Sequence, residues 1–434
     1  MYVSTIKNSP VQDQPKESLM SLLNRLQFIL YFLSGIFLLF QCKSSCAEAI
    51  EKPLTYTFSQ QILLQSKPNA HTWFHPRVAV IPNSDATQSS IVLMMLQKML
   101  PVSDYFSGMS TMQYSSKSQE WSKPVAPPEL GWIKGDGDVD IAVADVTPVW
   151  HPQLQKVIAV GTQVRYSKQG HQLDDKTRSH QTAYAIYDPK TEKWTSWKVL
   201  QMPADEKYDY ACSACAQWVV EPDGTLLMPF YHGPSSKTPF SVTVVRCTFN
   251  GTEIQFKDEG NTLKLNKVRG LFEPSLIKFQ NRYYLTLRND LKSYISTSKD
   301  GLHFEPIKAW TFDDGKDLGS YNTQQHWISH SDALFLVYTR RGANNDHIVR
   351  HRAPLFMAQI DPDKLTVLRE TEKIIVPEEG ALLGNFGAAD INRNESWVTV
   401  GERRNYKKIP KEQWKSNSVY LVKIKWSKPN LTQK

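Results

Sequence analysis

The chain has 434 residues, of which 41% are hydrophobic and 22% are charged, and its formal net charge is +8. These fractions are typical of a globular protein and exclude an intrinsically disordered one. The basic residues do not cluster on any recognisable helix, which argues against a nucleic-acid-binding protein and suits an acidic ligand. Frequent aromatic residues, together with 25 Pro and 20 Gly, favour short strands joined by turns.

Residues 1–49 have the features of an export signal. The apolar run 28–40 follows Arg25, and Ala47-Glu48-Ala49 has the small-x-small pattern of a cleavage site. Met20 is an alternative start, from which the signal has more usual proportions. The run is shorter than the roughly 20 residues that a membrane span needs. We therefore predict a secreted or periplasmic protein, with a retained membrane anchor as the alternative.

Six short apolar runs recur along the rest of the chain, about 50 to 70 residues apart. Most follow a turn sequence, and no long helical pattern interrupts them. The runs are 92–96, 157–161, 226–230, 283–287, 334–338 and 397–401. Regularly repeated small sheets are typical of a β-propeller, in which the sheets stack around an axis. We therefore predict that residues 50–434 form a single all-β domain, a six-bladed β-propeller, with a β-sandwich as the alternative.

One predicted blade, 269–306, carries both turn chemistry and charged residues. Its first strand begins after Glu273, its second strand ends at Arg288, and its third strand covers 293–297. The third strand leads into Ser298-Lys299-Asp300-Gly301, followed by Phe304. We expect the Asp300 carboxylate to accept backbone N–H bonds, Gly301 to adopt a positive φ, and the aromatic ring to pack beneath the turn.

This turn resembles the Asp-box of sialidases, and 116–121 and 188–194 look like degenerate copies of it. From about Trp73 onward the chain resembles the sialidase superfamily of six-bladed propellers, also called BNR-repeat proteins. The resemblance implies a sialidase-like glycoside hydrolase that acts on a terminal acidic sugar of a glycan. It also implies that three arginines hold the substrate carboxylate, since a guanidinium pairs with a carboxylate bidentately. The residues that match are Arg77, Arg288 and Arg340.

The resemblance extends to the catalytic residues in part. Glu273 precedes Arg288 by the family's spacing, which implies that Glu273 activates a tyrosine nucleophile. Asp104 lies roughly where the family keeps its acid/base aspartate. The nucleophile itself departs from the pattern, because Phe386 stands where the tyrosine is expected. The nucleophile would then have to be Tyr406 or Tyr321.

Two alternatives to hydrolysis remain open. A polysaccharide lyase on the same scaffold would cleave uronic-acid glycans by β-elimination, with a cation to neutralise the uronate and a Tyr or His to move a proton. Residues of these types at predicted strand ends are His75, Tyr231, Arg246 and His326. The polar loop 340–347 is the loop expected to reach a ligand. The other alternative is a glycan-binding propeller without catalysis.

No cofactor and no metal are predicted. Cys212 and Cys215 form a C-x-x-C pair, but the sequence has no second pair at zinc-binding spacing. In an oxidising compartment, one pair among these two residues and Cys247 could form a disulfide. The predicted partner is an acidic glycan or polysaccharide. We expect neither a nucleic acid nor a stable protein partner.

Overall fold

The computed structural model describes residues 53–83, 90–100, 104–174 and 178–432. The predicted signal peptide, 1–49, lies outside this part of the chain. Residues from Pro53 onward belong to one compact unit. Within the described residues, no helix is both long enough and apolar enough to cross a bilayer.

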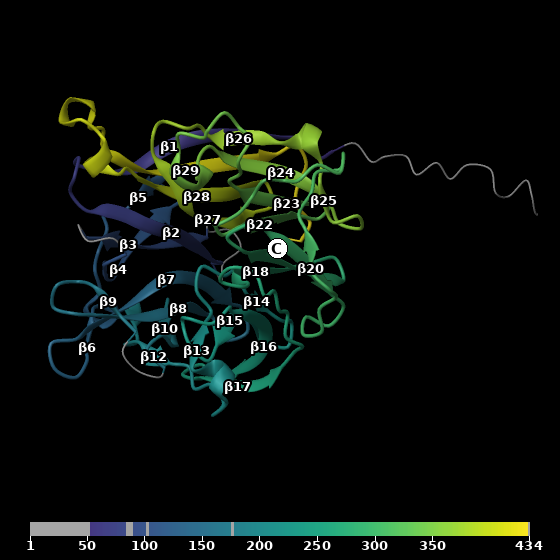
Figure 1. Cartoon of the computed structure of the whole chain (residues 1–434). Coiled ribbons are helices and arrows are strands. Elements are labelled where there is room, and N and C mark those ends of the chain that lie inside the picture. Colours follow the sequence, from purple (N-terminus) through teal and green to yellow (C-terminus); the bar gives the residue numbers. More distant parts are fainter. Residues whose placement is uncertain (1–52, 84–89, 101–103, 175–177, 433–434) are drawn as a thin grey trace, which may run out of the picture. The chain divides into compact units, whose positions relative to one another are not determined.

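The strands of the described residues form six antiparallel sheets, which follow one another in chain order (Figure 1). The innermost strand of each sheet contacts the innermost part of the next one, and the last contacts the first, so the sheets close into a ring. This arrangement confirms the predicted all-β propeller. From the first to the sixth sheet, the inner strands are β2 (Thr72–Ile81), β7 (Asp140–His151), β13 (Tyr210–Cys212) with β14 (Val219–Val220), β18 (Phe272–Phe279), β22 (His326–His330) and β27 (Leu382–Asn392).

Each of the six apolar runs lies in the second strand of a different sheet, so these strand predictions are confirmed. A second strand is covered on both faces by the neighbouring sheets, and it therefore has an unbroken apolar sequence rather than an alternating one. Every residue of β15 and β23, for example, is buried. The second strands are β3 (Ile91–Met99), β8 (Lys156–Tyr166), β15 (Leu226–Gly233), β19 (Arg282–Arg288), β23 (Ala333–Tyr338) and β28 (Glu395–Arg403).

The outer strands and the short 3₁₀ helices complete the sheets and their connections. The outer strands of the first three sheets are β4 (Phe106–Ser115), β5 (Glu120–Trp121), β9 (Gln172–Leu173), β10 (Thr182–Asp188), β11 (Lys193–Trp194), β12 (Lys198–Val199), β16 (Ser241–Phe249) and β17 (Ile254–Glu259). The short strand β6 (Ile133–Lys134) pairs with the start of the inner strand β7. Those of the last three are β20 (Tyr294–Ser298), β21 (Lys308–Ala309), β24 (Leu355–Asp361), β25 (Thr366–Val367), β26 (Lys373–Val376), β29 (Asn417–Trp426) and β1 (Tyr56–Ser66). The 3₁₀ helices are η1 (Pro128–Leu130), η2 (Glu206–Tyr208), η3 (Val349–His351), η4 (Arg369–Thr371), η5 (Tyr406–Lys408) and η6 (Lys411–Gln413).

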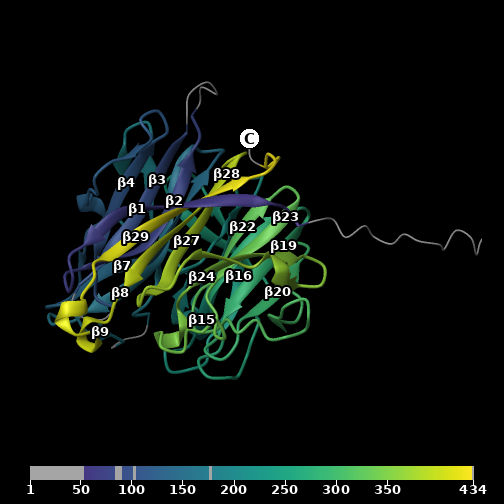
Figure 2. The ribbon, with the colours of Figure 1, turned by 90° about the horizontal axis from the view of Figure 1, so that it is seen from above.

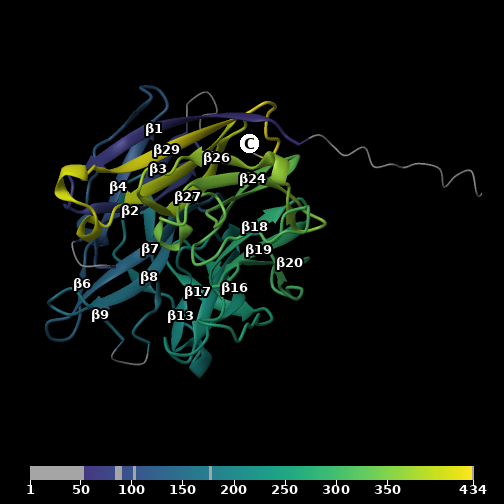
Figure 3. The same ribbon diagram turned by 45° about the horizontal axis from the view of Figure 1, so that its top comes forward.

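The ring is closed by strands from opposite ends of the domain. The N-terminal strand β1 pairs antiparallel with β29, from Tyr56 opposite Trp426 to Ser66 opposite Asn417. Figures 2 and 3 show β1 lying along β29 as the outer edge of the sixth sheet. The sixth sheet therefore contains the first and the last strand of the described chain.

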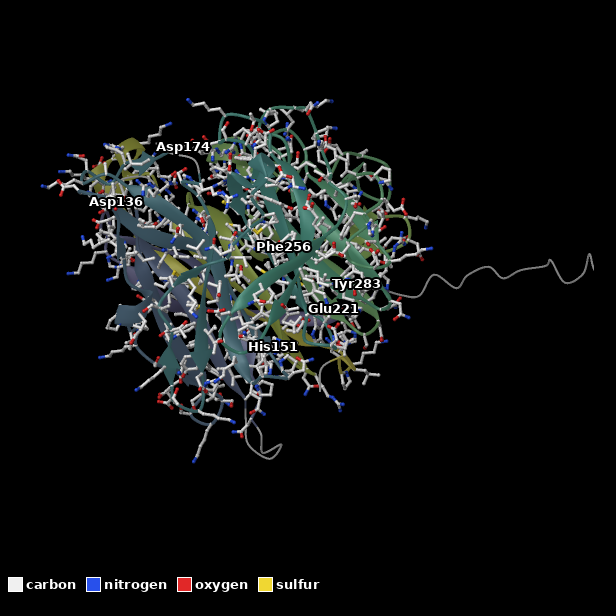
Figure 4. The ribbon with its side chains drawn as sticks, turned by 90° about the horizontal axis from the view of Figure 1, so that it is seen from below. Asp136, His151, Asp174, Glu221, Phe256 and Tyr283 are labelled. Atoms are coloured by element: carbon white, nitrogen blue, oxygen red, sulfur yellow. The ribbon has the colours of Figure 1, made fainter. Side chains whose placement is uncertain are left out.

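Apolar clusters fill the spaces between neighbouring sheets and hold the ring together. One cluster joins Phe335 of the fifth sheet to Val398 and Trp426 of the sixth. Each fully buried side chain of this size stabilises the fold by roughly 1.5–3 kcal/mol. Polar contacts add to these clusters at the end of the propeller where β18 meets β19. There Glu221 accepts hydrogen bonds from Tyr283 Oη at 2.7 Å and from Lys278 Nζ at 3.0 Å, and Glu221 and Tyr283 lie side by side in Figure 4.

The turn after β20 has the hydrogen bonds that the sequence predicts. Asp300 Oδ1 accepts from the backbone N–H groups of Leu302 and His303 at 2.9 and 2.8 Å. Gly301 has a φ of 78°, and Phe304 is buried beneath the turn. Burial opposes ionisation of Asp300, but the hydrogen bonds from His303 and Leu302 outweigh it and lower the pKa of the carboxyl. The assignment of further copies as BNR repeats stays a prediction.

We expect Asp300→Ala to lower the free energy of unfolding by about 1–2 kcal/mol at neutral pH, because two backbone donors lose their acceptor. A carboxylate whose pKa is lower in the folded state stabilises the fold above its ordinary pKa of 3.8 and stops doing so as the pH falls through its folded value. The difference in the free energy of unfolding between Asp300→Ala and wild type should therefore shrink as the pH falls below the ordinary pKa of the carboxyl. Urea unfolding at pH 7 and at low pH measures both effects. Lys299→Ala, an exposed change in the same turn, is the control.

Candidate functional site

A distorted backbone recurs at the end of the propeller where the inner strands begin. His75, Asp145 and Glu273 have φ values of 48°, 59° and 44°, and each lies where the pairing register of its inner strand shifts. Cys215, between β13 and β14, has a φ of 53°. A positive φ is uncommon in residues other than glycine, and such residues cluster at functional sites. Three inner strands thus have the same kind of bulge at one end of the axis, and the third sheet has a positive φ in the connection between β13 and β14.

Arg77 lies on the axis itself and ties several sheets together. Its guanidinium donates to the carbonyl oxygens of Asp145 at 2.9 Å, Val146 at 3.1 Å and Phe386 at 3.4 Å, and to Gln324 Oε1 at 2.7 Å. The residue is only 2% exposed. A Cβ atom at Gly387 would lie 2.6 Å from the Arg77 side chain, so this glycine makes room for it. These contacts argue for a structural role and against the predicted grip on a substrate carboxylate.

Further polar side chains fill the axis beside Arg77. Gln217, from the third sheet, bonds to the backbone of Trp327 in the fifth sheet and of Ala388 in the sixth. His326 is buried, and its Nδ1 atom lies 3.0 Å from Ser275 Oγ. Burial, followed by the nearby charge of Arg77, lowers the pKa of His326 well below its ordinary value of 6.5. His326 is therefore a neutral, enclosed side chain, and a proton-transfer role stays a prediction without support from this geometry.

Phe386 also belongs to the axial core. It is fully buried, its ring packs edge-on against His326, and its carbonyl oxygen accepts from Arg77 and Gln324. This position therefore has a packing role.

Glu273 and Arg288, which the sequence paired by spacing, are in contact. Arg288 Nη1 forms an ion pair with Glu273 Oε1, and Nη2 donates to Asn322 Oδ1 at 2.7 Å. The guanidinium lies over the Phe272 ring, 4.4 Å from its centre. The side chain of Arg288 is 7% exposed and that of Glu273 is 18% exposed. The pair thus lies at the bulge end of the axis, within reach of a ligand.

Arg352 is a second arginine at this place, and the sequence analysis missed it. Its Nε and Nη2 atoms donate to the Asn322 carbonyl oxygen at 3.2 and 2.6 Å, so Asn322 contacts both Arg352 and Arg288. Burial and then the charge of Arg288 lower the pKa of Arg352 to about 9, from an ordinary value of 12.5. A Cβ atom at Gly384 would lie 2.8 Å from the Arg352 side chain, so this glycine makes room for it. In the sequence, the only feature that pointed toward Arg352 was the neighbouring polar loop 340–347.

A hydrogen-bonded relay lies next to this arginine pair. Tyr321 precedes Asn322, and its hydroxyl lies 2.6 Å from His351 Nδ1. On the other side of the ring, His351 Nε2 lies 3.1 Å from Asp346 Oδ1. An ionised carboxylate only accepts hydrogen bonds, so in the neutral ring Nε2 carries the hydrogen. Nδ1 then accepts a hydrogen bond from the Tyr321 hydroxyl. Tyr406, the other tyrosine considered from the sequence, instead donates to the Lys415 carbonyl oxygen at 2.7 Å.

The remaining predicted residues lie in different surroundings. Arg340 pairs with Glu372 at 2.6 Å and packs over the rings of Phe312 and Phe356. Arg246 lies on the third strand of its sheet, opposite Leu227 and near the far end of the axis from the bulges. The structure therefore does not bring these two arginines to Arg288.

Asp104 and Tyr231 lie at the bulge end. Asp104 is exposed in the loop between β3 and β4, next to the end of β3 that pairs with the start of β2. Tyr231 is 9% exposed and packs against Tyr210, Phe240 and Phe272. Burial raises the pKa of Tyr231 well above its ordinary value. As catalytic residues, both stay predictions.

The three cysteines of the described chain are free and buried, so no pair of them is bridged. The Cys212 sulfur lies 3.0 Å from Thr162 Oγ1, and Cys247 belongs to an apolar cluster. Cys215 instead lies near His75 and Asp145, with one ligand atom from each of the three residues within 4.8 Å of the others. His75 Nε2 is 2.9 Å from Asp145 Oδ1.

Comparison with solved structures gives the same architecture. No family model and no curated protein matches this sequence. A protein of unknown function from Dyadobacter fermentans has a TM-score of 0.58 and 11% identity, over 85% of this chain and 99% of its own. A Trypanosoma rangeli sialidase has a TM-score of 0.57 and 12% identity, over 85% of this chain and 60% of its own.

A structure of NanB with Optactamide has a TM-score of 0.57 and 11% identity, over 84% of this chain and 70% of its own. The chain thus spans about 60% of the length of the Trypanosoma rangeli sialidase. At these identities the similarity shows the fold alone. The chain has an all-β propeller fold similar to that of sialidases.

Proposed function

We propose that this chain is an exported carbohydrate-active enzyme, a sialidase-like glycoside hydrolase that acts on a terminal acidic sugar of a glycan. In this proposal the six sheets are the blades of a six-bladed propeller of the BNR-repeat type. The ligand binds where the inner strands begin, at Glu273, Arg288 and Arg352. One solved structure with a similar fold is a Trypanosoma rangeli sialidase in complex with sialic acid, at 11% identity and a TM-score of 0.53.

The observation that carries the proposal is the arginine pair that meets at Asn322. The lowered pKa of Arg352 means that burial and Arg288 make its positive charge less favourable than in a solvent-exposed arginine. Glu273 pairs directly with Arg288, and Asp290 Oδ1 lies 3.9 Å from Arg288 Nη2. Arg352, by contrast, donates to the neutral carbonyl oxygen of Asn322. A ligand carboxylate between the two guanidinium groups would supply the missing negative charge, with charge-assisted hydrogen bonds.

Tyr321 is the nucleophile in this proposal. Its oxygen would bond to the anomeric carbon while the bond to the leaving sugar oxygen breaks, and His351 Nδ1 would take the phenol proton. Asp346 would stabilise the resulting imidazolium, in the manner of other base-and-carboxylate pairs. Asp104 is the predicted acid that protonates the leaving oxygen. Water would then release the sugar from Tyr321.

The same relay favours a second candidate, a polysaccharide lyase. In β-elimination, Arg288 and Arg352 would neutralise the uronate carboxylate, and Tyr321 with His351 would remove the neighbouring carbon-bound proton. The products separate the two reactions. Incubation with a sialylated oligosaccharide and with a uronate oligosaccharide should release free sugar in the first case and an ultraviolet-absorbing unsaturated uronate in the second. Binding without either product would leave a glycan-binding propeller.

Tyr321→Phe should lower kcat on the accepted glycan at least 100-fold, since loss of a general base or nucleophile typically costs 10²–10⁴-fold. The KM should change little, because the hydroxyl faces His351 rather than the arginine pair. Steady-state kinetics measures both constants. Tyr406→Phe, which removes a hydroxyl bonded to the main chain, is the matched control and should keep its activity. Wild-type kcat in Tyr321→Phe would remove this residue from the mechanism.

A further inference from the structure

The three residues His75, Asp145 and Cys215 form a cluster that the proposed glycan chemistry does not use. They come from β2, from β7 and from the connection between β13 and β14, and one ligand atom of each lies within 4.8 Å of the other two. An imidazole nitrogen, a carboxylate oxygen and a sulfur at about 2.0–2.3 Å from one ion would be roughly 3.5 Å apart in a tetrahedral site. A small contraction of the cluster would therefore produce the geometry of a metal site.

The backbone presents these side chains in a consistent way. All three residues have a positive φ, which costs of order 1–3 kcal/mol each; His75 and Asp145 lie at bulges of inner strands, and Cys215 lies in the connection between β13 and β14. Such strain persists only where the surrounding structure enforces it, and here it brings three side chains to one point on the axis. Packing alone does not require a histidine, an aspartate and a cysteine at the three equivalent positions.

The side chains also have unused capacity to bind an ion. His75 is 4% exposed; its Nε2 atom faces Asp145, and its buried Nδ1 atom has no hydrogen-bond partner among the described residues. The Asp145 side chain is 25% exposed, so the cluster is open on one side. A cation bound there would take the place of the thiol proton, as coordinating thiols are deprotonated.

From this geometry we propose that His75, Asp145 and Cys215 bind a zinc ion. Thiolate and imidazole together select zinc over magnesium and calcium, which prefer oxygen ligands. Three protein ligands leave the fourth position for water or a ligand oxygen, as in catalytic zinc sites. The Arg77 guanidinium lies against the Cys215 sulfur and supports the thiolate. Cys212 takes no part in this site. The sequence predicted no metal, so the proposed zinc ion departs from that expectation.

The alternative to a zinc site is that Cys215 is a nucleophile activated by His75. This alternative explains the cluster less well. A cysteine nucleophile needs a base or a positive charge that favours the thiolate. Here His75 Nε2 faces the Asp145 carboxylate, 2.9 Å away, rather than serving as a base for the thiol. A divalent cation would be attracted by Asp145 and by a Cys215 thiolate together.

The test is direct zinc binding by the full-length protein after removal of metals with a chelator. Titration against a chromogenic zinc chelator should give one zinc per chain, and zinc should raise the unfolding temperature. Cobalt(II) should give a thiolate-to-cobalt absorption band. Cys215→Ser and Asp145→Asn should each weaken zinc binding at least ~100-fold, and the serine variant should lose the cobalt band.

Cys247→Ser is the matched control, because it removes another buried free thiol and leaves the cluster intact. It should bind one zinc with wild-type affinity and keep the cobalt band. Circular dichroism checks that each variant is folded. Wild-type protein that binds no zinc, or a folded Cys215→Ser variant with unchanged affinity, overturns the proposal. Both results are independent of any glycan activity.

Discussion

Replacing Arg288 with alanine should weaken binding of the acidic glycan and lower kcat/KM by about 10²–10³-fold. Removing one partner of a buried, hydrogen-bonded charge pair typically costs about 2–5 kcal/mol in binding. Arg288 contacts Glu273, Asn322 and the face of Phe272, so its guanidinium is fixed in one orientation. A guanidinium held in one orientation donates two parallel hydrogen bonds to a carboxylate. Water in the space left by alanine would not reproduce both bonds. Isothermal titration with a sialylated and a uronate oligosaccharide measures the loss.

Stability has to be separated from binding in this experiment. Arg288→Ala leaves the Glu273 carboxylate without its cation, and an orphaned charge destabilises a fold by itself. The double variant Arg288→Ala with Glu273→Gln removes that charge, so it should recover stability and still bind weakly. Arg340→Ala is the control on the same fold: loss of its pairing with Glu372 should lower stability but leave glycan binding within threefold. A folded double variant with wild-type affinity would remove Arg288 from the ligand site.

Arg77→Met should produce the largest loss of stability, about 3–5 kcal/mol in the free energy of unfolding. Arg77 is 2% exposed and donates to four acceptors, on the second and sixth sheets and on Gln324 ahead of β22. Methionine fills similar volume but supplies no donor. Buried acceptors left without a partner cost roughly 1–3 kcal/mol each, reduced by any rearrangement of the axis. Urea unfolding at pH 7 measures the change.

Arg246→Met is the matched control for Arg77→Met. Arg246 lies on an outer strand and is only partly buried, so this change should cost less than about 1 kcal/mol. The same pair of variants also tests the role expected from the sequence. If Arg77→Met stays stable and loses glycan binding, Arg77 holds the ligand carboxylate after all.

The regular parts of this fold could be predicted from the sequence because they depend on local patterns. Six second strands are buried on both faces, so runs such as 226–230 are continuously apolar and easy to recognise. The Asp300 turn was predictable because all its hydrogen bonds are made within a few residues. Glu273 and Arg288 were predictable together because one hairpin, β18–β19, pairs Arg288 with Phe272, the residue before Glu273.

The rest of the site depends on contacts between distant sheets. Arg352 and Tyr321 come from two different loops and meet only through Asn322 and His351. The sequence around Arg77 matched a known motif. Its hydrogen-bond partners, however, lie more than 60 positions away in the sequence, so a local pattern cannot predict them. The positive φ values of His75, Asp145 and Cys215 were equally hidden, since none of them is a glycine.

The pairing of β1 with β29 has a consequence for biosynthesis. A ribosome delivers β1 first and β29 last, so five sheets can assemble in order while the sixth waits for the final strand. Bringing together two segments so far apart in sequence is entropically slow, and β1 has no partner until then. An unfinished chain therefore cannot close its ring until β29 has been synthesised. A circular permutant that joins the two ends and opens a surface loop elsewhere should build the same ring.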